Sequence, residues 1–223
     1  MVSIKSIQLD SISNAKRIVL KVGSALIVNP KTGNINESWV KSLVQDILFL
    51  LKNNKEILIV SSGAIALGKS ELNLQNKSLK LSEKQAAAAT GQILLAKAWK
   101  SIFEKVNIKC GQILVGHSDL ETRRNAMNTR ATLNTLLKLK VIPIINENDT
   151  VATREIRYGD NDQLAARVAQ ITSSDLLIIL SDVDGLYTSN PKKNSDATLI
   201  RYIKKITKSI EKSSENTSSS TAV

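Results

Sequence analysis

The chain has 223 residues, of which 42% are hydrophobic and only three are proline, which indicates a folded globular protein with one α/β domain and a large core, or at most two small domains. The net charge of +11 could attract nucleic acid, but the lysines are scattered and aromatic residues make up only 3%, which argues against that partner. Cys110 is the single cysteine and excludes an intrachain disulfide, and no apolar run approaches the roughly 18 residues of a membrane span. We therefore expect a cytoplasmic protein with no membrane partner.

Strands and helices alternate along the chain. Short apolar runs predict strands at 18–22, 56–60, 112–115, 141–145 and 176–180. Helical periodicity predicts helices over 39–51, 64–70, 82–106, 122–139 and 163–171, with Ser82 and Gln85 matching a capping box. Such alternation predicts a doubly wound fold, a three-layer αβα sandwich with a mostly parallel central sheet. We expect a lead-in over 1–16, one domain over 17–208 and a Ser/Thr-rich flexible tail over 209–223.

Two polar clusters flank one connection after the strand at 141–145. The first is Asn146 to Asp149, where that strand leaves the sheet, and the second is Gly159 to Asp162, ahead of the next helix. Ligands of open α/β sheets bind outside the carboxyl ends of the strands. The clusters could be solvated turns, because Asn, Asp and Gly are ordinary turn residues, but two of them on one connection favour a site for a small polar ligand.

A lysine lies near the end of the first predicted strand. Lys21 lies within the apolar run 18–22, and Gly23 and Ser24 follow it. A cation beside free backbone N–H groups could bind a phosphate. The same residues fit equally well a lysine whose ammonium extends from a sheet edge into water, so both interpretations stay open.

Residues Gly63 to Ser70 match the P-loop pattern G-x-x-x-x-G-K-S/T and follow a strand. This match makes an NTPase that uses Lys69 an alternative function. A P-loop wraps its backbone around phosphate, however, whereas the intervening Ala-Ile-Ala-Leu are good helix formers. We therefore expect 64–70 to begin a helix that packs on the sheet.

Other candidate sites are weaker. Asp182 to Gly185 lacks the spacing of a calcium loop, and His117, the only histidine, has no Cys or His neighbours for zinc, so we predict no metal ligands. Arg123, Arg124 and Arg130 fit an anion site and a solvated helix face equally well.

Five short motifs occur in an order and spacing that resemble the glutamate 5-kinases of the amino acid kinase family. They begin at Lys21 (KVGS), Val60 (VSSGAIA), Asn146 (NEND), Gly159 (GDND) and Ser181 (SDVDGLY). Each is short, but five in register are specific together, and the resemblance covers roughly residues 17 to 205.

The resemblance implies ATP-dependent phosphorylation of the γ-carboxylate of L-glutamate to L-glutamyl 5-phosphate, the first step of proline biosynthesis, with Mg²⁺. It implies that Lys21 meets the transferring phosphoryl group and that Asp162 orders this lysine. Nucleotide contacts are implied for Gly23, Ser24, Ser181 and Asp182, and substrate contacts for Ser62, Gly63, Asp149 and Asn161. Asp149 and Asn161 suit the ammonium and the carboxylate of an amino acid, in an order that the sequence leaves open. A homo-oligomer and a partner glutamyl phosphate reductase are also expected.

The chain departs from the family's pattern at its end. Family members continue with a Gly-rich segment, G-x-G-G-M-x-T-K, that holds the ATP phosphates, and many add an RNA-binding-like domain, whereas this chain ends in SSSTAV. Loss of preorganised charge typically lowers the rate by ~10²-fold or more. We therefore expect a fragment or an impaired kinase, and a non-catalytic remnant that binds glutamate or proline is a further alternative.

Overall fold

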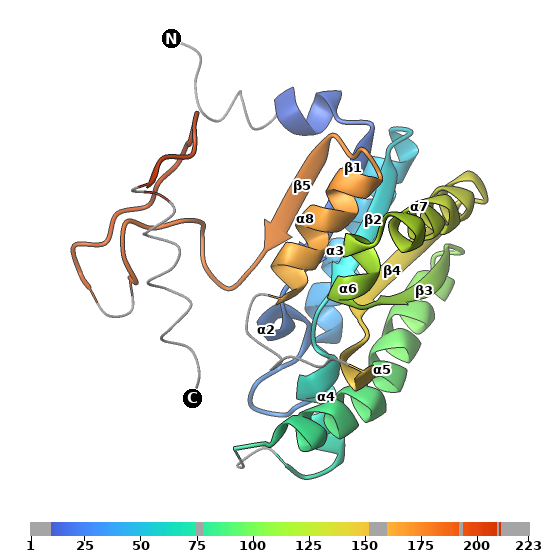
Figure 1. Ribbon diagram of the computed structural model, residues 1–223, viewed down its shortest axis with the longest axis vertical. Coiled ribbons are helices and arrows are strands. Elements are labelled where there is room, and N and C mark those ends of the chain that lie inside the picture. The colour runs from blue at the N-terminus through green and yellow to red at the C-terminus, as the bar shows by residue number, and fades with distance from the viewer. Residues whose placement is uncertain (1–9, 75–77, 152–159, 192–193, 209, 211–223) are drawn as a thin grey trace. The chain divides into compact units, whose positions relative to one another are not determined.

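The computed structural model describes residues 10–74, 78–151, 160–191, 194–208 and 210. In this part of the chain, five strands form one parallel sheet (Figure 1). The strands are β1 (Arg17–Val22), β2 (Glu56–Ser61), β3 (Lys109–Val115), β4 (Val141–Glu147) and β5 (Leu176–Leu180). Their order is β3-β4-β2-β1-β5, with every neighbouring pair parallel. The expected doubly wound parallel sheet is confirmed.

Helices cover both faces of this sheet (Figure 1). They are α2 (Ser24–Ile27), α3 (Glu37–Lys52), α4 (Ala64–Glu71), α5 (Leu81–Glu104), α6 (His117–Glu121), α7 (Arg123–Lys138) and α8 (Asp160–Ile171), with a 3₁₀ turn, η1 (Asp149–Val151). One hydrophobic core joins α3, α4 and α5 to one face. A second joins α6, α7 and α8 to the other. The three-layer αβα sandwich is thus confirmed.

The alternation of side chains along β1 decides which face receives its lysine. Ile18, Leu20 and Val22 belong to the core under α3 and α5. Val19 belongs to the core under α8. Because successive side chains of a strand point to opposite faces, Lys21 shares the face of Val19 and extends toward α8.

Both polar clusters lie partly in regular secondary structure, and Gly159 lies outside the described residues. β4 continues through Glu147, and α8 begins at Asp160 rather than at 163. Asn146 therefore lies inside a strand, only 2% exposed, and its side chain is hydrogen-bonded within the protein. Buried polar groups need such partners. Hydrogen bonding of the side chains, rather than the turn propensity of Asn and Asp, therefore decides where β4 ends and where α8 begins.

The segment that matches the P-loop pattern is helix α4, as expected. A Cβ on Gly68 would lie 1.7 Å from the carbonyl oxygen of Ala87, and one on Gly91 would lie 1.8 Å from that of Ala64. The backbones of α4 and α5 are therefore in direct contact. A helix packed this closely cannot wrap around a phosphate, and the alternative of a P-loop NTPase is set aside.

The start of α5 differs from the predicted capping box. The helix begins at Leu81, and the backbone N–H of Lys80 donates to Glu83 Oε2 at 2.8 Å. The capping pair is thus Lys80 and Glu83 instead of Ser82 and Gln85. Glu83 has the carboxylate that the third helical position favours, because it can accept from an N–H with no partner inside the helix.

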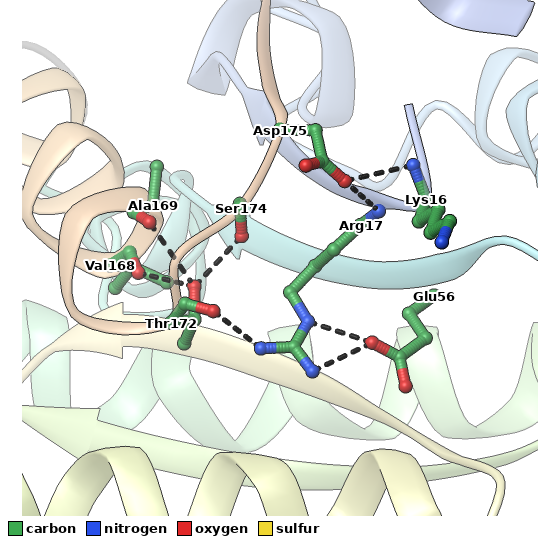
Figure 2. A network of polar contacts seen from close by, with 8 residues as sticks. All are labelled: Lys16, Arg17, Glu56, Val168, Ala169, Thr172, Ser174 and Asp175. Atoms are coloured by element: carbon green, nitrogen blue, oxygen red, sulfur yellow. Dashed lines mark hydrogen bonds and ion pairs between the residues drawn. The ribbon is translucent and has the colours of Figure 1, made fainter. Parts of the chain in front are cut away.

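A polar network ties β1 to α8 and β5 at the amino end of the sheet (Figure 2). The Arg17 guanidinium donates to Glu56 Oε2 at 2.7 Å and to the carbonyl oxygen of Thr172. The Thr172 hydroxyl donates to the carbonyl of Val168 at 2.6 Å, which secures the last turn of α8. Asp175 Oδ2 accepts from the backbone N–H groups of Lys16 and Arg17, both at 2.8 Å. The carboxyl end of α8 is thereby fixed to β1.

The chain divides into two compact units, residues 15–180 and residues 1–14 with 181–223. In the second unit, residues 10–14 are helical, and 186–200 contains an antiparallel pairing in which Ile200 N–H donates to the Leu186 carbonyl at 2.7 Å. The predicted boundaries near 16 and 208 stay predictions, and most of the predicted lead-in and tail lies outside the described residues. No helix in the described ranges has both the length and the apolarity needed to cross a membrane.

Replacement of Gly91 by alanine tests the α4–α5 contact. We expect Gly91→Ala to lower the free energy of unfolding by ~1–3 kcal/mol, because the added methyl group meets backbone atoms that cannot rotate away. This loss should appear although alanine favours a helix by about 1 kcal/mol over glycine. Gly111→Ala is the matched control, since its nearest contact would be a Leu136 side-chain atom at 3.4 Å. Equal urea midpoints for both variants would contradict the close contact.

The hydrogen bonds of Asp175 predict that part of the free energy of unfolding is lost in acid. The backbone N–H groups of Arg17 and Lys16 hold the pKa of this carboxyl below its ordinary value. A lowered pKa in the folded state means that the stabilisation is complete at neutral pH and disappears as the pH falls through the folded-state pKa. We expect Asp175→Ala to be less stable than the parent at pH 7 and equally stable in strong acid, measured by urea unfolding across pH. The same pH dependence in Asp46→Ala, at an exposed position of α3, would contradict this assignment.

Candidate active site

Three parallel strands end together at one edge of the sheet. Val22 of β1 lies opposite Ser61 of β2, and Val60 of β2 lies opposite Ile145 of β4. The carboxyl ends of β1, β2 and β4 therefore meet, and the polar residues that follow them converge. This is the edge at which open α/β sheets bind their ligands.

An ion pair occupies this edge. Lys21 Nζ lies 2.8 Å from Asp162 Oδ1 in the first turn of α8, and the two side chains are 11% and 43% exposed. The lysine stem is buried in the sheet while its partner reaches solvent. An ammonium has three N–H donors, and Asp162 is its ion-pair partner among the described residues. The charged group therefore has capacity left for an anionic ligand.

An amide cluster lies beside the ion pair in sequence and in space. Asn161 Nδ2 donates to Ser62 Oγ at 3.0 Å and to Asn146 Oδ1 at 3.1 Å. Both hydrogens of this amide nitrogen are thus used. Asn161 Oδ1 is buried and has no hydrogen-bond partner in the described part of the chain. A buried acceptor in this state suits a ligand that donates a hydrogen bond.

Two further predicted substrate residues lie at the same edge. Gly63 precedes α4 with φ +111° and ψ −6°, a left-handed conformation that favours glycine. Asp149 is buried in η1, three residues after Asn146, and the preceding Asn148 N–H donates to the carbonyl of Val115 at 3.0 Å. The structure thus gathers all four predicted substrate residues at the end of β2, the end of β4 and the start of α8.

The predicted nucleotide contacts belong to both compact units. The Gly23 N–H donates to the carbonyl of Leu180 at 3.0 Å, so it joins β1 to β5, and Ser24 begins the short helix α2. Ser181 and Asp182 follow β5 in the second unit, where Ser181 Oγ donates to Asp182 Oδ1 at 3.3 Å. The nucleotide role of these four residues stays a prediction.

Sequence reasoning missed two supporting residues of α5. Gln92 Oε1 accepts from Asn146 Nδ2 at 2.7 Å, and the buried Trp99 Nε1 donates to Ser61 Oγ at 2.9 Å. Helical periodicity assigns Trp99 to a buried face but cannot identify its partner. Gln92 lies in an Ala-rich helix with no motif around it, and only the adjacent Gly91 hints at a close approach.

The described residues contain no group of three or more His, Cys, Asp or Glu side chains that could hold a metal ion by themselves. The carboxylates at this edge include Glu147 at the end of β4, Asp149 in η1 and Asp162 in α8. The site therefore combines the Lys21 cation with carboxylates, amides and a hydroxyl. Such a set binds and orients a charged, hydrogen-bonding ligand and supplies positive charge to an anion.

Comparison with known proteins identifies the family. The model of the amino acid kinase family matches residues 16–221. Glutamate 5-kinases from Brucella ovis, Brucella canis and Brucella melitensis are each 58% identical to the chain over 203 residues, which is 91% of this chain and 53% of theirs. The chain thus spans about half the length of these curated relatives.

Solved structures share the fold at low sequence identity. The UMP kinase from Bacillus anthracis matches with a TM-score of 0.56 and 16% identity, over 83% of this chain and 72% of that one. The UMP kinase from Ureaplasma parvum matches with a TM-score of 0.55 and 19% identity, over 90% and 86%. The family model covers Lys21 and both polar clusters within nearly the whole chain, and this protein therefore belongs to the amino acid kinase family.

Proposed function

We propose that this chain carries the amino-acid and phosphoryl-transfer site of a glutamate 5-kinase, which phosphorylates the γ-carboxylate of L-glutamate with ATP. The observation that carries the proposal is the Lys21–Asp162 ion pair next to the Asn161 amide cluster, at the carboxyl edge of the sheet. The 58% identity to curated glutamate 5-kinases supports the choice of substrate.

The acceptor chemistry suits a site built from lysine and amides. A γ-carboxylate, with an ordinary pKa of about 4.3, is already ionised at neutral pH, so its attack on phosphorus needs no general base. The difficulty is to bring two anions together. Catalysis then depends on position and on neutralising charge, which Lys21 can supply without any histidine.

Asp162 would act on the reaction through Lys21. Its carboxylate, 2.8 Å from the ammonium, limits where that group can lie. The lysine side chain is only 11% exposed, and a charge so far withdrawn from water interacts more strongly with a phosphoryl group than a solvated one would. We propose that Lys21 stabilises the transferring phosphoryl group and that Asp162 is a positioning residue.

The amide cluster suggests how the amino acid would be oriented. Asn161 presents an acceptor, so we assign it, with the carboxylate of Asp149, to the α-ammonium of glutamate. Ser62 Oγ accepts from Asn161, which leaves its own hydrogen to donate to a carboxylate oxygen. Gly63 would let the chain turn closely past the substrate before α4 begins.

The residues present fit a magnesium nucleotide. Mg²⁺ commonly takes one or two carboxylates together with substrate phosphates, and Asp162, whose side chain is 43% exposed beside Lys21, is the carboxylate of this edge that could take part. When bound, Mg²⁺ would neutralise charge on the phosphates. Gly23, Ser24 and Ser181 would contact the nucleotide. We also propose a cytoplasmic location, where ATP and glutamate are available, a homo-oligomer, and a reductase that consumes the labile acyl phosphate.

A paired lysine substitution tests the proposal. We expect Lys21→Met, which keeps the buried stem, to lower glutamate-dependent ADP formation with Mg²⁺ and ATP by about 100-fold or more. Lys41→Met is the matched control, because Lys41 also lies 2.8 Å from a carboxylate, Glu37, but on the exposed face of α3. Its rate should stay within about twofold of the parent, since surface ion pairs contribute little.

Equal rates for the Lys21 and Lys41 variants would overturn the assignment of Lys21. Calorimetry with L-glutamate separates binding from turnover. Glutamate binding that is unaffected by either substitution, without any ADP formation in the parent chain, would instead identify a non-catalytic glutamate-binding protein.

A further inference from the structure

We infer that Gln92 is a positioning residue of this site, because it acts through Asn146 to hold the Asn161 carboxamide in one orientation. The identity of the ligand rests on the proposed function, whereas the orientation itself rests on hydrogen bonds alone. The residues form a chain of contacts from α5 through β4 to the start of α8, and its far end is Ser62 after β2.

The orientation of the first amide is settled by a backbone donor. The two ends of a carboxamide have nearly the same shape, so their identity must come from their partners. The backbone N–H of Glu147 can only donate, and it lies 2.9 Å from the Asn146 side chain. The atom that it meets must therefore be Oδ1, and the opposite end of Asn146 must be Nδ2.

The orientation of the second amide follows from the first. The Asn161 atom 3.1 Å from Asn146 Oδ1 must be a donor, which makes it Nδ2, and the same nitrogen reaches Ser62 Oγ at 3.0 Å. Asn161 Oδ1 is then the remaining atom, buried and without a hydrogen-bond partner among the described residues. The site consequently offers an acceptor, as an ammonium group requires.

Gln92 supports this arrangement from the other side. Its Oε1 accepts from Asn146 Nδ2 at 2.7 Å. Asn146 is 2% exposed, so water has little access to replace this acceptor. A rotated Asn146 would turn its nitrogen toward the N–H of Glu147, which replaces a hydrogen bond by repulsion. Gln92 accepts from the opposite end of Asn146 and so holds the side chain in the orientation that the Glu147 N–H selects, in which Asn161 exposes oxygen.

The packing of α5 explains why a helical residue can reach the site. Gly91, the neighbour of Gln92, touches the backbone of Ala64 and Gly68 in α4, and a Cβ there would lie 1.8 Å from the Ala64 carbonyl oxygen. This contact holds α5 against the start of α4, directly after Ser62 and Gly63. Gln92 is therefore carried to the carboxyl edge of the sheet by the helix contact.

Three variants of Gln92 separate hydrogen bonding from shape. Gln92→Met keeps the size of the side chain but removes the acceptor, whereas Gln92→Glu keeps an acceptor. The ammonium of Gln92→Lys can only donate, and it can reach water from this half-buried position. This variant therefore replaces Gln92→Met as the test of a lost acceptor if the methionine variant does not fold. Gln170→Met is the control, because it makes the same change at an exposed glutamine of α8 that accepts from Arg167 at 3.2 Å.

The first measurement needs no ligand. In the ¹⁵N-labelled full chain, we expect Gln92→Met or Gln92→Lys to shift the side-chain amide signals of Asn146 and Asn161 and to speed their hydrogen exchange by about tenfold, the factor for one lost hydrogen bond of 1.4 kcal/mol. Gln92→Glu and Gln170→Met should leave the Asn161 exchange rate within about threefold of the parent. An unchanged Asn161 signal in both disruptive variants would overturn the inference.

The second measurement is the affinity for L-glutamate by calorimetry. We expect its Kd to rise about tenfold in Gln92→Met and to return to within about threefold of the parent in Gln92→Glu. Failure of the glutamate variant to restore affinity would show that shape, not the acceptor, matters and would overturn the inference. If the parent binds no glutamate, the proposed function fails, and the amide signals alone decide the role of Gln92.

Discussion

The ion pair between Lys21 and Asp162 is the interaction on which the site depends. A lysine near the end of a buried strand is costly unless its ammonium has a partner, and α8 supplies one at 2.8 Å. The alternation of β1 directs Lys21 to the α8 face, and the early start of α8 at Asp160 puts Asp162 in its first turn. Strand geometry and helix position thus produce one paired cation at the edge where ligands bind.

The rest of the fold holds the two partners of this pair in place. At the amino end of the sheet, Arg17 and Asp175 join β1 to the end of α8 and the start of β5 (Figure 2). At the carboxyl end, Asn161 joins the start of α8 to β2 and β4. Helix α8 is therefore tied to the sheet at both ends. The direct contact of α4 with α5 through Gly68 and Gly91 adds a rigid support behind Ser62.

Much of the fold could be predicted because it depends on local periodicity. The apolar runs and helical patterns identify each strand of the sheet and the alternation that makes it parallel. Errors arose where local rules compete with tertiary partners. Asn146 was expected just beyond the end of a strand at 141–145, yet it is a strand residue because Gln92 and Asn161 satisfy its side chain. The P-loop match at Gly63 to Ser70 was discounted correctly, since helix formers occupy the positions where a phosphate loop must bend.

By itself, the sequence determined the doubly wound fold, the family and the convergence of Lys21, Asp162 and Asn161 on one edge, because strand ends and motif order are properties of the chain. Only the tertiary structure decided which atom of Asn161 faces the site. That atom depends on Asn146 and on Gln92, 54 residues from Asn146 in the chain. No local pattern encodes this contact, because it joins a side chain of α5 to one of β4, and these meet only when the helix packs on the sheet.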